Sequence, residues 1–182
     1  MTRKTFLASS IGGAGLLLTG GILRNLPSKE LTGKLTIDAV QKQLKEFKQN
    51  PALIKTTGAW SAFQVFTHCA QSIELSFSGF PVHKGELFKA ALGKTAFSVF
   101  AARGRLSHNL AEQIPGLPEI ETSKDPEAIS KSIDRLANAF TKLGTATEGF
   151  QEHFAYGPLT IPQQKMAHIL HFYNHLEEFD LT

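Results

Sequence analysis

The sequence predicts an all-α protein whose helices pack as a bundle. Five segments of the 182-residue chain carry apolar residues at the three- and four-residue spacing that lines one face of a helix. No segment shows the strict apolar–polar alternation of a convincing strand. Several helices are joined by short turns, which favours antiparallel packing of neighbours.

Residues 1–27 have the layout of a bacterial export signal. A short basic start with Arg3 and Lys4 precedes an apolar, glycine-rich run. Lys4 stands where a twin-arginine signal has its second arginine, so the export route is left open. The apolar run is barely long enough to cross a bilayer, for which about 20 residues are needed. We expect a cleaved signal, with an uncleaved membrane anchor as the alternative, followed by one domain at 28–182.

Charge and cysteine content exclude several classes of protein. The chain has a formal net charge of +3, but its three excess basic residues all lie in residues 1–27. The remainder carries 16 basic and 16 acidic residues, without the basic face that a nucleic-acid-binding protein normally keeps. We therefore discount nucleic acid as a partner. The single cysteine, Cys69, excludes an intrachain disulfide and a CxxC metal site.

The first two predicted helices follow a linker that ends at Lys34. Thr36 is the predicted N-cap of the first helix, and Asn50-Pro51 ends it. The second helix spans 59–77, where His68 lies outside the apolar stripe, in a polar sector. The apolar stripes are Ile37, Val40, Leu44 and Phe47 in the first helix and Phe63, Phe66, Ala70, Ile73 and Phe77 in the second.

A third helix is predicted at 84–102 and a fourth from Asp125-Pro126 to Leu143, ended by Gly144. Between them, residues 103–124 form a long irregular connection of the kind that is often functional or covers a site. The third helix has apolar positions at Leu87, Phe88, Ala91, Phe97 and Phe100, with Gly93 allowing either close packing or a bend. The stripe of the fourth is Ile129, Ile133, Leu136 and Phe140.

The last predicted helix, 163–179, carries the residues of greatest chemical interest. His171 and His175 are four residues apart, so they lie one turn apart on the same side of the helix. Two neutral imidazoles so placed can share a metal ion, although at least one further ligand is needed. Both lie at the edge of the apolar stripe, which can face a cleft between helices or water, and the spacing alone is a weak indication of a metal site because it also occurs by chance.

Two groups of residues resemble the DinB/YfiT-like superfamily, over about residues 35–180. They are Trp60, Thr67-His68-Cys69-Ala70, Ile73-Glu74 and Ser78-Gly79-Phe80-Pro81, and then His171-Phe172-Tyr173-Asn174-His175-Leu176 with Phe179. The segment 153–160 resembles a turn of an uncharacterised branch, a domain of unknown function, with Phe154 in place of Pro and Tyr156 in place of Phe. The Trp usual early in the last helix of that branch is absent here.

The resemblance implies a four-helix-type up-and-down bundle with an extra helix. It also implies a three-histidine site for a divalent metal ion, with His68, His171 and His175 as ligands and Zn, Ni, Fe or Mn as the metal. Characterised members of the superfamily are similar in using the metal in transferase, isomerase or hydrolase chemistry.

The sequence leaves the roles of several other residues open. His68 has the alternative of a hydrogen-bonded core histidine. His168 is predicted to be a solvated surface residue, with a supporting or ligand role as the alternative, and His153 either caps the last loop or approaches the site. Glu74 is predicted at the surface. Candidates to support the ligands are Gln64, Gln71, Asn174 and Glu178.

The predicted function is that of an exported divalent-metal-dependent enzyme, of hydrolase or transferase type, acting on a small-molecule substrate. The alternative is a non-catalytic extracytoplasmic bundle that binds a metal or another ligand. No catalytic acid or base can be assigned from the sequence. Membrane contact is expected only through an uncleaved N-terminal segment, and a homodimer is the oligomer considered.

Overall fold

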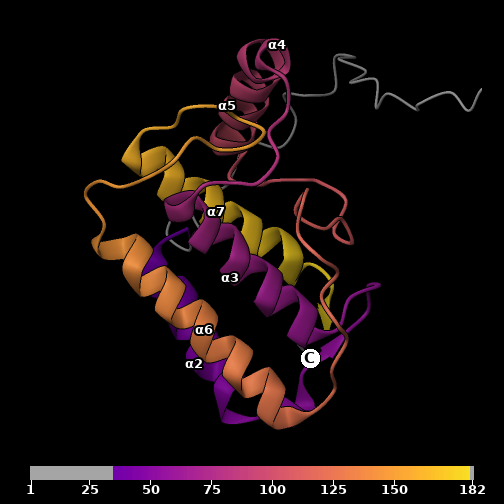
Figure 1. The fold of residues 1–182 in the computed structure, drawn as a ribbon. Helices are drawn as coiled ribbons and strands as arrows, with labels where there is room; N and C mark the ends of the chain where they lie inside the picture. The colour runs from indigo at the N-terminus through magenta and orange to yellow at the C-terminus, as the bar shows by residue number, and fades with distance from the viewer. Residues whose placement is uncertain (1–34, 181–182) are drawn as a thin grey trace, which may run out of the picture.

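The computed structural model describes residues 35–180, and this part of the chain is mainly helical, as predicted. Four long helices form the bundle (Figure 1): α2 (Ile37–Gln49), α3 (Ala62–Ser78), α6 (Pro126–Thr145) and α7 (Ile161–Leu176). The predicted export signal at 1–27 lies outside the described residues. Among the described helices, none combines the length and apolarity needed to cross a membrane.

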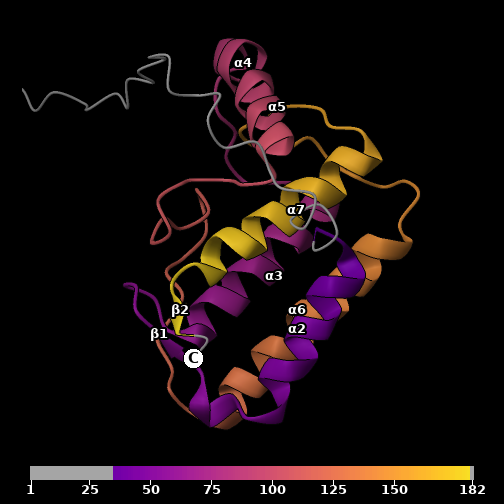
Figure 2. The ribbon, with the colours of Figure 1, turned by 180° about the vertical axis from the view of Figure 1, so that it is seen from behind.

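The bundle core is built from the predicted apolar stripes. Helix α3 packs against both α6 and α7, and α2 packs against α6 on the other side of the bundle, as the view from behind also shows (Figure 2). Side chains from all four helices are completely buried there: Val40, Leu44, Phe66, Ile73, Leu136, Phe140 and Phe172. Each such side chain contributes roughly 1.5–3 kcal/mol through its removal from water. This packing holds α3 and α7, the two helices that carry the predicted ligands, side by side.

Side-chain caps fix where the helices begin. Thr36 caps α2 by accepting a hydrogen bond from the Ala39 N–H at 3.1 Å, and Asp125 caps α6, as predicted. Helix α3 begins three residues later than predicted, because Ser61 and Gln64 form a capping box at its start. Helix α6 continues through Gly144 and ends at Thr145.

The prediction that the chain has no strand is wrong at one place. Strands β1 (Lys55–Thr56) and β2 (Phe179–Asp180) form a short antiparallel ladder that follows the 3₁₀ turn η1 (Pro51–Leu53). Phe179 therefore leaves α7, which was expected to include it, and pairs with Thr56. The ladder fixes the end of α7 to the segment that leads into α3.

The third predicted helix differs most from expectation. It is an arm of α4 (Glu86–Phe88), a π-helical segment η2 (Lys89–Gly93) and α5 (Lys94–Arg103) that projects from one end of the bundle (Figures 1 and 2). Of its five predicted apolar positions, Phe97 alone is buried. The arm is attached through Gly93, which packs directly on the Ala155 carbonyl, and through buried Lys89, whose Nζ lies 2.7 Å from Glu152 Oε1. Gly93 thus allows close packing, one of its two predicted roles.

Candidate metal centre

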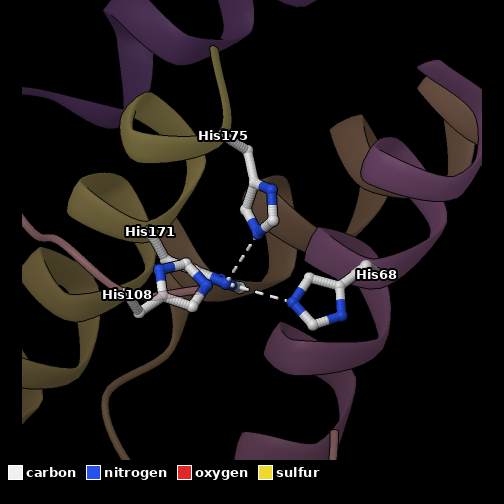
Figure 3. Close-up of side chains that lie close together, drawn as sticks. All are labelled: His68, His108, His171 and His175. Atoms are coloured by element: carbon white, nitrogen blue, oxygen red, sulfur yellow. Dashed lines mark hydrogen bonds between the residues drawn. The ribbon is translucent and has the colours of Figure 1, made fainter. Parts of the chain in front are cut away.

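The structure brings His68, His171 and His175 together in the contact between α3 and α7. The Nε2 atom of His171 lies 3.2 Å from Nε2 of His68 and 3.2 Å from Nε2 of His175. Figure 3 shows the three rings directing these nitrogens toward one point. Helical spacing places His171 and His175 on one side of α7, and in the structure that side faces His68 of α3.

A fourth histidine, His108, belongs to this cluster, although no sequence pattern predicted it as a ligand. It comes from the irregular segment between α5 and α6, and one nitrogen from each of the four rings lies within 4.8 Å of the others. No periodic pattern connects His108 to the helical pair. The one available indication was its place in a long connection, which predicted a functional segment without identifying a residue.

The distances suit a common tetrahedral ligand sphere. Two histidine nitrogens at about 2.0–2.1 Å from one tetrahedral ion are about 3.3 Å apart. The two Nε2 separations of 3.2 Å match this value, and all four donor nitrogens lie within 4.8 Å of one another. The donor set contains histidine alone, without a carboxylate or thiolate. Imidazole is a ligand for Zn, Cu, Fe and Ni, so the set fits a divalent transition metal.

Burial keeps these imidazoles neutral, which is the form that binds a metal. His175 is completely buried and His68 is 3% exposed, whereas His171 is partly buried and His108 is exposed. Burial, and then repulsion from His108, lowers the pKa of His68 to about 3. Burial likewise lowers the pKa of His175 to about 2, with smaller effects of His68 and His108. The pKa of His171 is well below its ordinary value, chiefly because of burial and then because of His175.

Hydrogen bonds between the rings cannot account for both close contacts among the three nitrogens. Each close Nε2 contact needs one N–H and one lone pair, and the nitrogen of His171 takes part in both contacts. This nitrogen carries either one proton or one lone pair, so it can form only one well-aligned hydrogen bond. A cation accepts lone pairs from all three nitrogens at once. The arrangement is therefore one that a metal ion would complete.

Two neighbours constrain the rings. Trp60 stacks against His175, with ring centroids 5.9 Å apart and planes within 3°, and meets His68 edge-on at 4.9 Å. Asn174, between the two α7 ligands, lies with Oδ1 2.7 Å from His108 Nδ1. The buried Nδ1 atoms of His68 and His175 have no hydrogen-bond partner within residues 35–180. Of the four candidate supporting residues, Asn174 is thus the one that hydrogen-bonds to an imidazole of the cluster.

The other three candidates lie elsewhere or make no such contact. Gln64 completes the α3 capping box and donates from Nε2 to the Ile120 carbonyl at 2.9 Å. Gln71 has a buried Oε1 that finds no partner in the described part of the chain. Glu178 lies against Gly58. Glu74 is at the surface, as predicted, in a two-point contact with Arg135.

His168 and His153 are both buried. The prediction that His168 is a solvated surface residue is wrong, because its side of α7 packs on α3 and its Nδ1 lies 3.5 Å from Ser72 Oγ. Burial lowers the pKa of His168 to about 4. His153 caps the last loop, one of its two predicted roles, since its Nδ1 accepts hydrogen bonds from the Ala155 and Tyr156 N–H groups at 3.2 Å.

Comparison with known proteins places the chain in a family without assigning a reaction. The model of a family described as "Protein of unknown function (DUF1569)" matches residues 29–182. Neither the curated proteins nor the solved structures gave a match. Because the matched region includes the whole helical bundle and all four histidines of the cluster, the chain belongs to the DUF1569 family of proteins of unknown function.

Proposed function

We propose that this protein is a divalent-metal-dependent enzyme of hydrolase or transferase type, with His68, His171 and His175 as the metal ligands. The observation that carries the proposal is the position of His171 Nε2, which is 3.2 Å from the Nε2 atoms of both other residues. Three protein ligands with a fourth position open to water or substrate are the usual layout of a catalytic zinc site.

The chain's own residues have defined tasks in this proposal. His68 and His175 are buried and neutral, so each presents a lone pair at ordinary pH without first having to lose a proton. Trp60 packs on both rings and limits their rotation. A metal held there would supply Lewis-acid activation of a carbonyl group, a water molecule or a thiol. The resemblance to the DinB/YfiT-like superfamily supports the same chemistry and the same three residues.

We also propose that the domain acts outside the cytoplasm on a small molecule. The basic and apolar composition of residues 1–27 supports export, by a cleaved signal or with the segment retained as an anchor. Export separates the protein from cytosolic thiols, so hydrolysis, or transfer to another acceptor, suits it better than thiol transfer. Fractionation of cells that produce the full chain tests this location, and recovery with cytosolic markers would contradict it.

Metal analysis of protein purified without a histidine tag tests the metal centre. We expect close to one equivalent of Zn, Ni, Fe or Mn per chain, and loss of the metal in both His68→Ala and His171→Ala. The matched control is His83→Ala, because His83 is an exposed histidine outside the cluster. Metal content that stays unchanged in the two cluster variants, or falls equally in the control, contradicts the proposal.

The second candidate is a non-catalytic metal-binding module. It is favoured by the fourth imidazole, because four protein ligands are typical of structural sites, in which no position is left for a substrate. Turnover of ester, amide or thiol substrates by the metal-loaded protein supports the enzyme. Tight metal binding together with no turnover across such panels favours the module.

A further inference from the structure

The cluster combines two kinds of histidine. His68, His171 and His175 project from α3 and α7, the packed helices of the bundle. His108 belongs to the irregular segment between α5 and α6, and it is exposed although its donor nitrogen lies within 4.8 Å of the others. Helix-borne ligands are held by the core, whereas a ligand on a connecting segment can move without unfolding the bundle.

Asn174 determines which nitrogen His108 offers to the cluster. The Oδ1 atom of Asn174 accepts a hydrogen bond, so Nδ1 of His108, at 2.7 Å, donates it. In neutral His108 the lone pair is then on Nε2. Asn174 is buried between His171 and His175 on α7, and it therefore orients the fourth donor from the same helix that carries two of the others.

The segment that carries His108 is attached on both sides of this residue. Before it, Arg105 makes a two-point contact with Glu177 at 2.8 and 2.6 Å, and Leu106 is buried in the core. After it, Ile114 and Ile120 are buried. These anchors hold the segment in place on either side of His108, which is exposed together with its two neighbours. The side chain of His108 is held by its hydrogen bond to Asn174 and by ring contacts with His171 and His175, so an outward turn breaks these contacts and leaves the anchors intact.

We propose that His108 is the displaceable fourth donor of the metal centre and that the substrate occupies the position His108 vacates. The inference rests on the proposed metal centre and adds how it opens. Four imidazole donors are then compatible with a catalytic role, because displacement of His108 opens one coordination position for the substrate. The substrate class is then a small molecule with a nitrogen, oxygen or sulfur lone pair that can compete with an imidazole.

Cobalt(II) substitution provides the test, because the visible spectrum of Co(II) reports the number and type of its ligands. The full chain is prepared metal-free and loaded with Co(II), as the natural chain and as His108→Ala, Asn174→Ala and Ser107→Ala. Ser107→Ala is the matched control, since Ser107 is the exposed neighbour of His108. Imidazole and azide serve as the exogenous ligands.

We expect all four proteins to bind one equivalent of Co(II). In His108→Ala the spectrum should change, added imidazole should restore the natural spectrum, and azide should bind roughly tenfold more tightly than to the natural chain. Asn174→Ala should change in the same direction to a smaller extent, and Ser107→Ala should match the natural chain.

Two results overturn the inference and leave the metal centre intact. A natural spectrum and natural azide affinity in Co(II)-loaded His108→Ala mean that His108 is not a donor. Loss of Co(II) from His108→Ala, with an unchanged melting temperature of the metal-free form, means that His108 is required rather than displaceable. Failure of the natural chain itself to bind Co(II) would instead contradict the proposed metal centre.

Discussion

The Oδ1 atom of Asn174 lies 2.7 Å from Nδ1 of His108 and links the last helix to a connecting segment 66 residues earlier in the chain. The link joins a buried amide on α7 to an exposed imidazole. Within the described part of the chain, it is the one hydrogen bond found between an imidazole ring of the cluster and a residue outside the cluster.

This contact predicts a graded effect of substitutions at Asn174 on metal affinity. Asn174→Leu removes the acceptor, and loss of such a supporting contact typically weakens metal binding about 10–100-fold. Asn174→Asp keeps an acceptor for the His108 N–H and should retain most of the affinity. Competition with a chromophoric chelator measures both values. Equal affinities for the leucine and aspartate variants would show that the hydrogen bond does not orient His108.

Alanine substitutions at two helical glycines, Gly93 in the arm and Gly144 in α6, should have different effects on the free energy of unfolding. A methyl group at Gly93 would overlap the Ala155 carbonyl, which is backbone and cannot turn aside. Gly93→Ala should therefore lower the free energy of unfolding by about 1–3 kcal/mol. Gly144→Ala is the matched control, because the added methyl meets the Ile37 side chain at an ordinary 3.5 Å. It should be neutral or stabilising by up to about 1 kcal/mol.

Urea unfolding of both glycine variants, followed by circular dichroism, distinguishes these effects. Limited proteolysis locates the change, since cleavage in the arm should accelerate in Gly93→Ala alone. If the alanine at position 93 is as well tolerated as the alanine at position 144, then the arm does not pack on Ala155 as described.

The loop cap at His153 predicts a pH-dependent stability. Burial, and then repulsion from His168, lowers the pKa of His153 from 6.5 to about 3. Above pH 6.5 the residue is neutral in the folded and unfolded chains, so it adds no pH dependence. Between pH 6.5 and about pH 3, His153 is protonated in the unfolded chain but stays neutral in the folded chain. The free energy of unfolding therefore falls by about 1.4 kcal/mol for each unit by which the pH is lowered in this range.

His153→Asn isolates this effect, because an asparagine Oδ1 can accept the same loop N–H groups but does not titrate. Metal-free samples are compared at pH 7, 5.5 and 4.5 by urea unfolding. The variant should lose less stability than the natural chain as the pH falls. Parallel pH profiles would mean that His153 is not neutral and buried in the folded protein.

Much of the bundle was predictable from the sequence because its residues obey periodic rules. The stripes through Val40, Leu44 and Phe140 follow helical spacing, and Thr36 and Asp125 cap the helices they were expected to cap. The spacing of His171 and His175 placed both on one side of α7. Their meeting with His68 followed from a family resemblance, since periodicity does not determine which helices pack together.

The errors arise where tertiary contacts override local pattern. Leu87 and Phe88 have helical spacing but are exposed, because the arm that carries them projects from the bundle. Phe179 continues the apolar stripe of α7 but pairs with Thr56 in a ladder whose partner strand is only two residues long. His108 lies in a segment without periodicity, so no local rule could direct it to the cluster. A correct prediction at each of these places would have required knowledge of how distant parts of the chain pack together.

The central claim is that one cation joins His68, His171 and His175. Anomalous diffraction from a crystal of the metal-containing protein, recorded at the absorption edge of the metal found by analysis, tests it most directly. We expect a single strong peak about 2.0–2.1 Å from the Nε2 atom of each of the three residues. A peak at any other place on the chain, or rings that turn their nitrogens apart with no peak between them, would contradict it.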